Sequence, residues 1–589
     1  MCVQPVAWPE PDPQVAVAVA VMYRGRRERP LPVLVRDKLG AWLADEQFAG
    51  AYGRRGRPGW PPSRLALVTI FQEVEDLADR QAAEAVRTRI DWKYALGLDL
   101  ADPGFDHSVL SEFRGKVAAG GLERVVLDAL LARLAADGLV KGGGKQRTDS
   151  TRVVAAVAAL NRLELAGEAV RAALEALTAA HPDWVAQRVC VSDFARRYGA
   201  PMTSWRPPAS QAKQDQLAIA YARDGYALVE AVYHSTAPGW LRELPAVQTL
   251  RVVLLQNYTR TITGGGREVI RRREKEPEGD GLPPGHARIA SPYDTDARWG
   301  AKRGTFWLGY KLHLTETCDD PPPCTCRTAA AEPAAAGGGH AKGCATLVHP
   351  NLITHVATTG ATVTDNQMTE PVHAALAARN LAPGQHYADS GYLSAELVVS
   401  ALSTYGIALT GPLLADRSAQ ARTGGYTQQA FTIDFDRQQA TCPQGAVSSK
   451  WKPMRTRDGK HAINVRFATA TCRHCPARHM CTTATRTGRQ LLLRPREIHQ
   501  ATTAARAAEA STGFHAGYTR RAGIEGTIHQ ATSHGARRAR YRGLPKTRLD
   551  HVYMACALNL LRLEAFWTGT ALDRRRTSHL ARLEHHPAA

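Results

Sequence analysis

The sequence predicts an α/β fold in which a mixed sheet is flanked by helices and follows an all-α N-terminal region. Three observations predict it. Between residues 32 and 135, apolar helical stretches alternate with short breaks. Residues 306–314 alternate apolar and polar side chains, and residues 352–358 and 386–389 also have the composition of strands. A helical pattern over residues 367–378 lies between the last two strands, as in a sheet covered by helices.

Length and charge limit the classes of function. The chain has 589 residues, enough for about three or four domains. Its 75 Lys and Arg exceed its 55 Asp and Glu, which gives a formal charge of +20 and favours a polyanionic partner such as nucleic acid. No apolar run reaches the ~18–20 residues of a membrane span, and residues 15–22 lack the flank and length of a signal peptide. We therefore expect a soluble, cytoplasmic, nucleoid-associated protein with no membrane partner.

Changes in composition divide the chain into segments. Residues 1–140 are expected to form a helical DNA-binding module, although the pattern supports a plain helical packing domain nearly as well. The sheet domain is expected at residues 141–152 and 286–400, and a helical insertion with a charged loop at 153–285. An Ala- and Gly-rich stretch at 328–343 is expected to be a disordered loop within the sheet domain. The remaining segments are a cysteine-containing insertion at 401–510, C-terminal helices of the sheet domain at 511–570 and a basic tail at 571–589.

One acidic residue lies among cations near the C-terminus. The pattern Y-x-x-R-x-x-x-E from Tyr518 to Glu525 places Arg521 and Glu525 four residues apart, on one face of a predicted helix. A carboxylate in this setting suits a metal ion beside a phosphate backbone. The alternative is that Arg521 only forms a salt bridge with Glu525.

Two aspartates could complete a carboxylate site with Glu525. Asp389 ends a predicted strand, where functional residues of α/β sheets gather. Asp149 follows a glycine run and could instead cap the helix predicted after it. Each aspartate alone is more often a turn former or cap, but the three acids together on a basic chain indicate one site. Three further aspartates could supplement it, although each fits a turn or cap equally well: Asp294, Asp296 and Asp365.

Three such acids have a known chemical use. Two divalent cations held about 3.5–4 Å apart by shared carboxylates can activate water or a 3′-hydroxyl and stabilise the departing oxygen of a phosphodiester. Mg²⁺ needs few carboxylates because it keeps several waters. We therefore expect two Mg²⁺ ions, or Mn²⁺ ions, at Asp149, Asp389 and Glu525. Flanking phosphates could be held by Arg537, Arg538, Arg540 and Arg542.

Several motifs carry a resemblance to a known family. The element from Tyr518 to Glu525 resembles the signature of bacterial insertion-sequence DDE transposases, whose catalytic domain has an RNase H-like fold. The N-terminal helical part resembles the module that commonly precedes this domain. The resemblance covers most of the chain and implies an RNase H-like mixed sheet. Four further segments are similar to the eleven-eighty-two insertion-sequence family: RTDST (147–151), SPYDTDARWGAKRGTFWLGYKLHLTET (291–317), HYADSGY (386–392) and RARYRGLPKT (538–547).

The resemblance also implies roles for single residues. Asp149 and Asp389 match the first and second catalytic aspartates, and Glu525 matches the glutamate. Tyr518 and Arg521 match the family's tyrosine and arginine and, with Lys546, are expected to contact DNA. A lysine is often found seven residues after the glutamate, but Thr532 stands there in this chain. Either Arg537 or Arg538 takes over that phosphate contact, or the contact is absent.

The activity implied is cut-and-paste transposition. The protein would cut DNA at the ends of its own element and join the freed 3′-hydroxyl to target DNA. The N-terminal helices would bind the terminal inverted repeats, and a homodimer would hold two ends together. Two rival hypotheses are a metal-dependent nuclease without strand transfer and a transposase-derived DNA-binding protein that has lost catalysis.

Some of the eleven cysteines have the spacing of a structural zinc site. Cys442, Cys472, Cys475 and Cys481 could bind Zn²⁺ tetrahedrally, and their alternatives are reduced thiols or a disulfide pair. Four thiolates leave no open coordination position, so this site would stiffen an insertion and take no part in catalysis. A second, less regular group consists of Cys318, Cys324, Cys326, Cys344 and His340.

Overall fold

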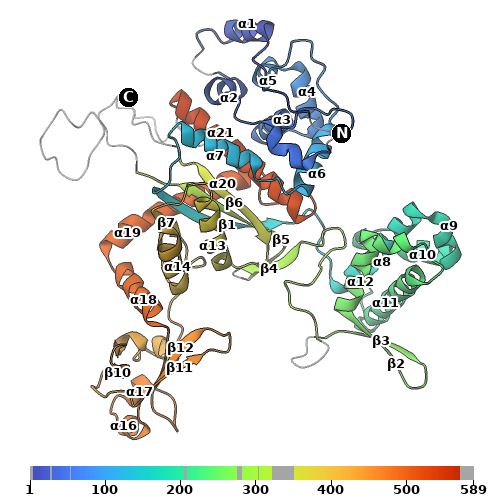
Figure 1. The fold of residues 1–589 in the computed structure, drawn as a ribbon. Coiled ribbons are helices and arrows are strands. Elements are labelled where there is room, and N and C mark those ends of the chain that lie inside the picture. Colours follow the sequence, from blue (N-terminus) through green and yellow to red (C-terminus); the bar gives the residue numbers. More distant parts are fainter. Residues whose placement is uncertain are drawn as a thin grey trace, which may run out of the picture.

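A computed structural model describes residues 4–26, 29–53, 55–204, 208–274, 281–302, 304–320 and 350–570. A β-sheet lies at the centre with helices packed against it, and the N-terminal helices lie beyond the long helix α21 (Leu544–Thr568) (Figure 1). A helical unit and a unit of small sheets project from this centre (Figure 1). The predicted α/β class with a helical N-terminal region is confirmed. The predicted loop at 328–343, the basic tail at 571–589 and all of the second cysteine group except Cys318 lie outside the described residues.

The central sheet has five core strands in the order β6-β5-β1-β7-β8. β5 is antiparallel to both β1 and β6, whereas β7 is parallel to both β1 and β8. A sixth strand, β4 (Arg298–Lys302), forms a hairpin with the start of β5. This order and these directions are those of an RNase H-like sheet, so that prediction is confirmed. The core strands are β1 Lys145–Val154, β5 Thr305–Thr317, β6 Ile353–Gly360, β7 Gln385–Ala388 and β8 Ala408–Thr410.

The central strand β1 is the one core strand before residue 400 that the sequence did not indicate. Its sequence KQRTDSTRVV is mostly polar, so it lacks the apolar alternation by which half-buried strands are recognised. The strand is stable because its polar side chains find partners inside the sheet. The Thr148 hydroxyl, for example, lies 2.7 Å from the Thr315 hydroxyl and 2.6 Å from His386 Nε2. Asp149 is therefore a strand residue, and the alternative that it caps a helix is wrong.

Helices pack around the sheet and join it to the N-terminal region. α13 (Thr369–Ala377) continues the 3₁₀ turn η5 (Asp365–Met368), and α14 (Ala395–Tyr405) lies beside it. α20 (Gly523–Ser533) lies against β1, and α21 contacts both β6 and the N-terminal helices. Apart from α1, every helix of the N-terminal region contributes buried side chains to one continuous core with the sheet. The N-terminal elements are α1 Pro13–Met22, α2 Leu31–Leu39, η1 Asp45–Ala51, α3 Pro62–Glu75, α4 Asp79–Thr88, α5 Ile90–Leu96, α6 Ser108–Ala119 and α7 Val125–Ala136.

A helical unit lies in the connection between β1 and β4. Its helices surround a separate core, and an antiparallel hairpin of β2 and β3 extends from it. The predicted helical character of this segment is confirmed, and the hairpin was not predicted. Its elements are α8 Arg162–Ala180, α9 Pro182–Arg188, α10 Val191–Tyr198, η2 Met202–Ser204, α11 Gln211–Tyr233, η3 Gly239–Glu243, α12 Pro245–Asn257, β2 Tyr258–Ile262 and β3 Glu268–Arg272.

A second unit lies between β8 and the last helices of the chain. It contains a two-stranded and a three-stranded sheet around a small core that includes Phe431, Val465 and Phe467. α18 (Arg496–Glu509) and α19 (Thr512–Tyr518) then lead back to the central sheet. The other elements are α15 Ala419–Thr423, η6 Gln428–Ala430, β9 Thr432–Asp434, β10 Gln439–Thr441, β11 Lys450–Arg455, β12 His461–Arg466, α16 Thr469–Arg473, α17 Arg478–Cys481 and β13 Gln490–Leu493.

The described helices were also compared with the requirements of a membrane span. None of them is both long enough and apolar enough to cross a bilayer.

A buried asparagine joins α21 to the sheet. Asn559 is fully buried, its Oδ1 accepts from the Ile353 N–H at 2.8 Å, and its Nδ2 donates to the Ile353 carbonyl at 2.9 Å. One side chain therefore satisfies both backbone groups at the start of β6, where β5 is the neighbouring strand on the other side.

Replacing this side chain should destabilise the fold strongly. Asn559→Ala leaves two buried backbone groups without partners, so we expect the free energy of unfolding to fall by about 2–5 kcal/mol. Chemical denaturation monitored by circular dichroism measures this loss. Asn464→Ala in β12, where the asparagine is half-buried, is the matched control and should cost less than about 1 kcal/mol. Equal losses in the two variants would contradict this role of Asn559.

Candidate active site

Strand pairing places two aspartates side by side. β1 and β7 are parallel, and Thr148 of β1 is paired with Ala388 of β7. Asp149 and Asp389 are the next residues along these two chains, so they occupy adjacent positions on neighbours about 4.8 Å apart. The sheet thus brings together two acids that are 240 residues apart in the sequence.

Asp149 is held in a buried, polar setting. Its Oδ1 accepts from the backbone N–H of Ser150 at 2.7 Å, and its Oδ2 accepts from Arg521 Nη2 at 2.6 Å. Only 13% of its side chain is exposed. Burial raises the pKa of Asp149 above its ordinary value, the negative charge of Asp389 adds to this, and the Arg521 guanidinium opposes it. Ionisation of Asp149 is therefore less favourable than in water, even with Arg521 beside it.

Asp389 faces another carboxylate, Asp365. The N–H of Gly391 donates to Asp389 Oδ1 at 2.9 Å. A Cβ atom on Gly391 would lie 3.0 Å from Asp389 Oδ1 and 3.1 Å from Asp365 Oδ2, so both carboxylates border the space that this glycine leaves free. Asp365 Oδ1 in turn accepts from the Ser150 hydroxyl at 3.1 Å and from Lys311 Nζ at 3.2 Å. Asp365 is thus a fourth acid at the site.

Asp294 and Asp296, the other two aspartates considered from the sequence, each accept a hydrogen bond from a backbone N–H. Asp294 Oδ1 accepts from the Tyr310 hydroxyl at 2.6 Å and from the Ala297 N–H at 3.1 Å. Asp296 Oδ2 accepts from the Leu544 N–H at 3.0 Å, at the start of α21. Both therefore fit the turn and cap alternative.

Glu525 reaches the same place from the first turn of α20. Arg521 Nη1 donates to Glu525 Oε1 at 2.9 Å while Nη2 of the same guanidinium binds Asp149. The salt bridge within the Y-x-x-R-x-x-x-E element therefore forms, but it also extends to β1. The Glu525 side chain is 66% exposed, so it is free to turn toward a ligand. One arginine thus links two of the three predicted acids.

Tyr518 lies beside the third acid. Its hydroxyl is 3.4 Å from the carbonyl of Ala388, the residue before Asp389. Burial raises the pKa of Tyr518, with Arg521 opposing and the three acids adding to the shift. The hydroxyl therefore stays protonated at neutral pH and can donate a hydrogen bond to an anion.

The described side chains contain no ready-made metal cage. In the described part of the chain, no group of three or more His, Cys, Asp or Glu side chains is arranged to hold a metal ion. At the acidic site, Arg521 binds both Asp149 and Glu525. The donor chemistry still fits Mg²⁺ or Mn²⁺, because these ions prefer carboxylate oxygens.

The predicted phosphate-binding arginines do not form a helix. Residues 535–543 are turns and bends, and the Val154 N–H donates to the Arg537 carbonyl at 2.9 Å, so this segment is fixed to the end of β1. Val154 is five residues beyond Asp149, about 17 Å along the strand. Arg537, Arg538, Arg542 and Lys546 are exposed there.

Three side chains in this region are already engaged, and one of them is Arg542, whose Cζ lies 5.4 Å from the centroid of the Tyr293 ring. Arg540 Nη1 binds Glu73 at 3.0 Å and its Nη2 donates to the Leu77 carbonyl, which ties the segment to α3. The Thr532 hydroxyl donates to the His529 carbonyl at 2.9 Å within α20. Arg540 would have to leave Glu73 to reach a phosphate.

The four cysteines of the second unit face one cavity. Cys442, Cys472, Cys475 and Cys481 all line a space of about 250 Å³. All four are reduced, so the alternative of a disulfide pair is not adopted. The N–H of Ala446 donates to Cys442 Sγ at 3.3 Å, and burial together with the other three thiols raises the pKa of Cys481. Thiols from three separate segments are thus gathered at one place.

The sequence did not indicate the roles of Ser150 and Gly391, and it left the role of Asp365 open. Ser150 and Gly391 lie in the motifs RTDST and HYADSGY, one and two residues after the predicted aspartates. Lys311 and Asp365 lie in other segments, and only the fold brings them to the site. The glycine in HYADSGY was readable as a turn residue, but its closeness to two carboxylates was not.

Two segments of the chain match known protein families. Residues 441–564 match the family described as transposase DDE domain, and residues 24–116 match the family described as transposase domain (DUF772). The first match includes Glu525 and the four cysteines, whereas Asp149 and Asp389 lie before it. Neither the curated proteins nor the solved structures that were searched contain a match.

The raised pKa of Asp149 leads to a pH-dependent effect on stability. Because the pKa is raised above 3.8 in the folded state, the stability that the protonated carboxyl contributes is present below pH 3.8 and is lost as the pH rises through the folded value. Asp149→Asn keeps a neutral side chain at every pH. Its melting temperature relative to the unchanged protein should therefore rise between pH 4 and pH 7, measured in EDTA.

Asp193→Asn in α10, on the exposed surface of the helical unit, is the control and should follow the unchanged protein at every pH. A difference for Asp149→Asn that does not vary with pH would refute the unfavourable ionisation of Asp149.

Proposed function

We propose that this chain, a DDE transposase that cuts and joins DNA, uses the acidic site at the end of β1 and β7 as its catalytic site. Asp149, Asp389 and Glu525 are assigned as its catalytic acids. One observation carries this assignment: Arg521 binds both Asp149 of β1 and Glu525 of α20, and Asp389 directly follows β7, the strand paired with β1. Asp365 borders the same space and would support Asp389.

These acids would hold two Mg²⁺ or Mn²⁺ ions. When bound, the ions would supply activation of the attacking oxygen and stabilisation of the departing oxygen at a phosphodiester. Asp149 and Asp389, which are fixed by the sheet, and Glu525, which is exposed on α20, would be the carboxylates that hold these ions. The backbone N–H groups of Ser150 and Gly391 keep the two aspartates oriented.

Arg521 and Tyr518 would bind the DNA backbone. Arg521 shares its guanidinium between Asp149 and Glu525, so it lies beside two of the acids that would hold the ions. It could form a bidentate contact with the scissile or adjacent phosphate. The Tyr518 hydroxyl, held next to Asp389 and protonated, would donate to a phosphate oxygen. Both side chains thus reach the phosphate from the helical side of the site.

Phosphates farther along the DNA would meet the turn after α20. Arg537, Arg538, Arg542 and Lys546 are exposed on this turn and at the start of α21. Because Thr532 is short and is engaged within the helix, we assign the contact expected of a lysine there to Arg537 or Arg538. Arg540 could add to these contacts only after leaving Glu73.

The proposal also covers the insertion-sequence family of the protein, the DNA that it binds and its oligomeric state. The motifs RTDST, HYADSGY and RARYRGLPKT support membership in the eleven-eighty-two insertion-sequence family. The N-terminal helices would bind the terminal inverted repeats, and a homodimer would bring two element ends together because joining requires both. These assignments rest on the resemblance and on the reaction.

The proposed acids can be tested by one substitution. Asp149→Ala should abolish cleavage of a labelled duplex carrying the DNA that borders the gene, and also its joining to a plasmid, while the affinity for the duplex changes less than about threefold. Loss of a metal-binding acid affects the chemical step, whereas DNA binding depends mainly on phosphate contacts. Gel analysis of labelled products and filter binding measure the two effects. Asp193→Ala is the control and should cleave and join normally.

Two results would contradict the proposal. Unchanged cleavage by Asp149→Ala would exclude its role as a catalytic acid. Cleavage by the unchanged protein without any joined product would favour the nuclease hypothesis.

We also propose that the four cysteines bind one structural Zn²⁺. Their thiols line one cavity, and an N–H donated to Cys442 Sγ is a contact that stabilises a thiolate. Since the thiols are not at ligand distances in this conformation, binding would require them to move inward. The metal would then hold together the two small sheets and the short helices α16 and α17 between β8 and α18.

Zinc content tests this site directly. The purified protein should contain about one zinc per chain by plasma mass spectrometry, and Cys475→Ser should contain far less. Cys190→Ser is the control, because Cys190 is exposed in the helical unit and away from the cavity. A zinc content that is the same in Cys475→Ser as in Cys190→Ser would refute the site.

A further inference from the structure

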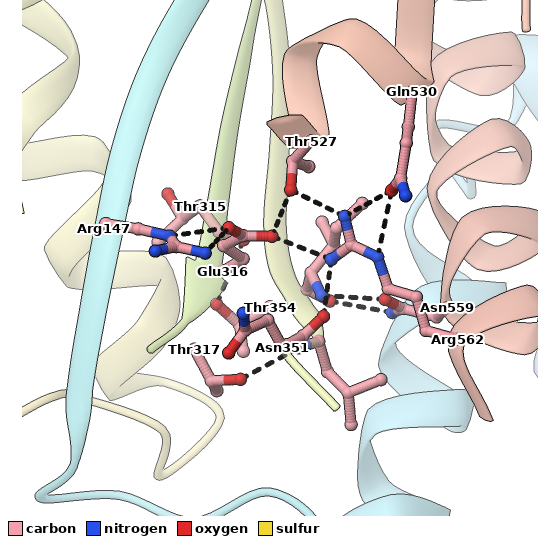
Figure 2. A network of polar contacts seen from close by, with 12 residues as sticks. Arg147, Thr315, Glu316, Thr317, Asn351, Thr354, Thr527, Gln530, Asn559 and Arg562 are labelled. Carbon is pink, nitrogen blue, oxygen red and sulfur yellow. Dashed lines mark hydrogen bonds and ion pairs between the residues drawn. The ribbon is translucent and has the colours of Figure 1, made fainter. Parts of the chain in front are cut away.

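A fully buried glutamate connects the elements that carry two of the proposed catalytic acids. Glu316, near the end of β5, is 0% exposed. Its Oε1 accepts from Arg147 Nε at 2.7 Å, and its Oε2 accepts from the Thr527 hydroxyl at 2.5 Å and from Arg562 Nη1 at 2.7 Å (Figure 2). Both oxygens are therefore satisfied, and partners come from β1, α20 and α21.

The partners lie close to the acids in the sequence. Arg147 precedes Asp149 by two residues on β1, and Thr527 follows Glu525 by two residues on α20. Alternation along a strand puts Arg147 and Asp149 on one face of the sheet. Thr527 is buried while Glu525 is exposed, so α20 turns one face to Glu316 and the other to the site. A short chain of contacts thus runs from one acid to the other through Glu316.

Arg147 also fixes the start of α20. Its Nη1 donates to the Arg520 carbonyl at 2.6 Å. A Cβ on Gly523 would lie 2.0 Å from the same nitrogen, so the first residue of α20 must be a glycine for this approach. The guanidinium therefore lies directly against the backbone that leads into Glu525.

Arg562 completes the link from the other side. It donates to Glu316 through Nη1, to the Thr527 hydroxyl through Nη2 at 2.6 Å and to Gln530 Oε1 at 2.8 Å (Figure 2). Thr527 and Gln530 lie on successive turns of α20. The helix is thus held to the sheet by a charged group whose burial is tolerated because both of its oxygens are paired.

Glu525 depends on side-chain contacts for its position more than the two aspartates do. Asp149 and Asp389 are set by backbone pairing between β1 and β7. α20 is outside the sheet, and its first turns meet the sheet through side chains, whereas backbone pairing with β1 begins only at Arg537. A shift of about 1 Å in a metal-binding carboxylate is enough to impair catalysis.

We propose that Glu316 is a positioning residue that holds the Glu525 helix at the distance from Asp149 required to share metal ions. This inference rests on the proposed role of the three acids. Glu316 itself touches neither metal nor DNA in this proposal, because it is enclosed between Arg147, Thr527 and Arg562. Its effect passes through Thr527 to Glu525 and through Arg147 to the start of α20.

The sharpest test removes one hydroxyl. Thr527→Val keeps the shape of the side chain but cannot donate to Glu316, whereas Thr527→Ser can. Fe²⁺ with ascorbate and peroxide cleaves a protein chain near bound iron, so it reports which segments surround the metal. In the unchanged protein we expect cuts near residues 149, 389 and 525. In Thr527→Val, cuts near 149 and 389 should persist, and those near 525 should fall about tenfold.

Two controls separate positioning from general destabilisation. Thr69→Val removes a buried threonine hydroxyl from α3, where it donates to the Leu65 carbonyl at 2.8 Å, and should leave all three cuts unchanged. Thr527→Ser should restore the cuts near 525. Mn²⁺ affinity, measured by electron paramagnetic resonance, should weaken about tenfold in Thr527→Val and stay normal in both controls.

The outcomes are distinguishable. If Thr527→Val gives the same cuts and Mn²⁺ affinity as the unchanged protein, the positioning role is refuted while the acids stand. If the unchanged protein shows no cuts at any of the three segments, the proposed metal site fails and this inference fails with it. Glu316→Gln, which weakens the same link from its centre, should lose the cuts near 525 as well, and a normal pattern in that variant would also overturn the proposal.

Discussion

Repulsion between carboxylates is the constraint on which the centre of this molecule depends. The fold brings Asp149, Asp389 and Asp365 to one edge of the sheet, and two like charges 4 Å apart repel by about 4 kcal/mol even at an effective dielectric constant of 20. Two cationic side chains reduce this repulsion. Arg521 binds Asp149 and Glu525, and Lys311 binds Asp365. The same need for positive charge is what makes the site suitable for divalent ions and for a phosphate backbone.

The basic composition of the chain has more than one use. The formal charge of +20 indicates a polyanionic partner, but several arginines form ion pairs inside the protein. Arg147 and Arg562 balance the buried Glu316, and Arg114 lies beside Asp79 in the N-terminal core. Arg537 and Arg538, by contrast, are exposed near the end of β1. Net charge therefore predicts the class of partner, while burial decides which cations can meet it.

The parts of the fold that sequence could predict are those with regular apolar patterns. Residues 306–314 alternate and form β5, and the helix expected at 367–378 appears as η5 and α13. β1 could not be predicted in this way because its stability comes from partners such as Thr315, His386 and Glu316, which belong to other strands. The pairing of polar side chains across a sheet leaves no periodic signal in one strand alone.

The same reasoning applies to the site. Asp389 at a strand end and Glu525 in its arginine-containing element were predictable, since each lies in a local pattern with a chemical meaning. Asp365 was weighed and left open, because a turn explains it as well as a ligand does. The approach of Gly391 to two carboxylates, together with the contact between Asp365 and Ser150, distinguishes these alternatives. Glu316 gave no signal, because a glutamate within LTET is ordinary until its arginine partners, from β1 and α21, are placed around it.

The unit of small sheets is connected to the acidic site through the helices that follow it. Its last strand leads to α18, and Arg494 pairs with Glu396 of α14, while Glu509 at the end of α18 accepts from the Leu413 N–H at 2.5 Å. α18 and α19 then deliver the chain to Tyr518 and α20. The segment that includes α18 is therefore held at both ends before the chain reaches Glu525. Since the entropy of loop closure rises only slowly with length, an insertion of this size costs the fold little, and its contacts with α14 and Leu413 determine how the chain returns to the sheet.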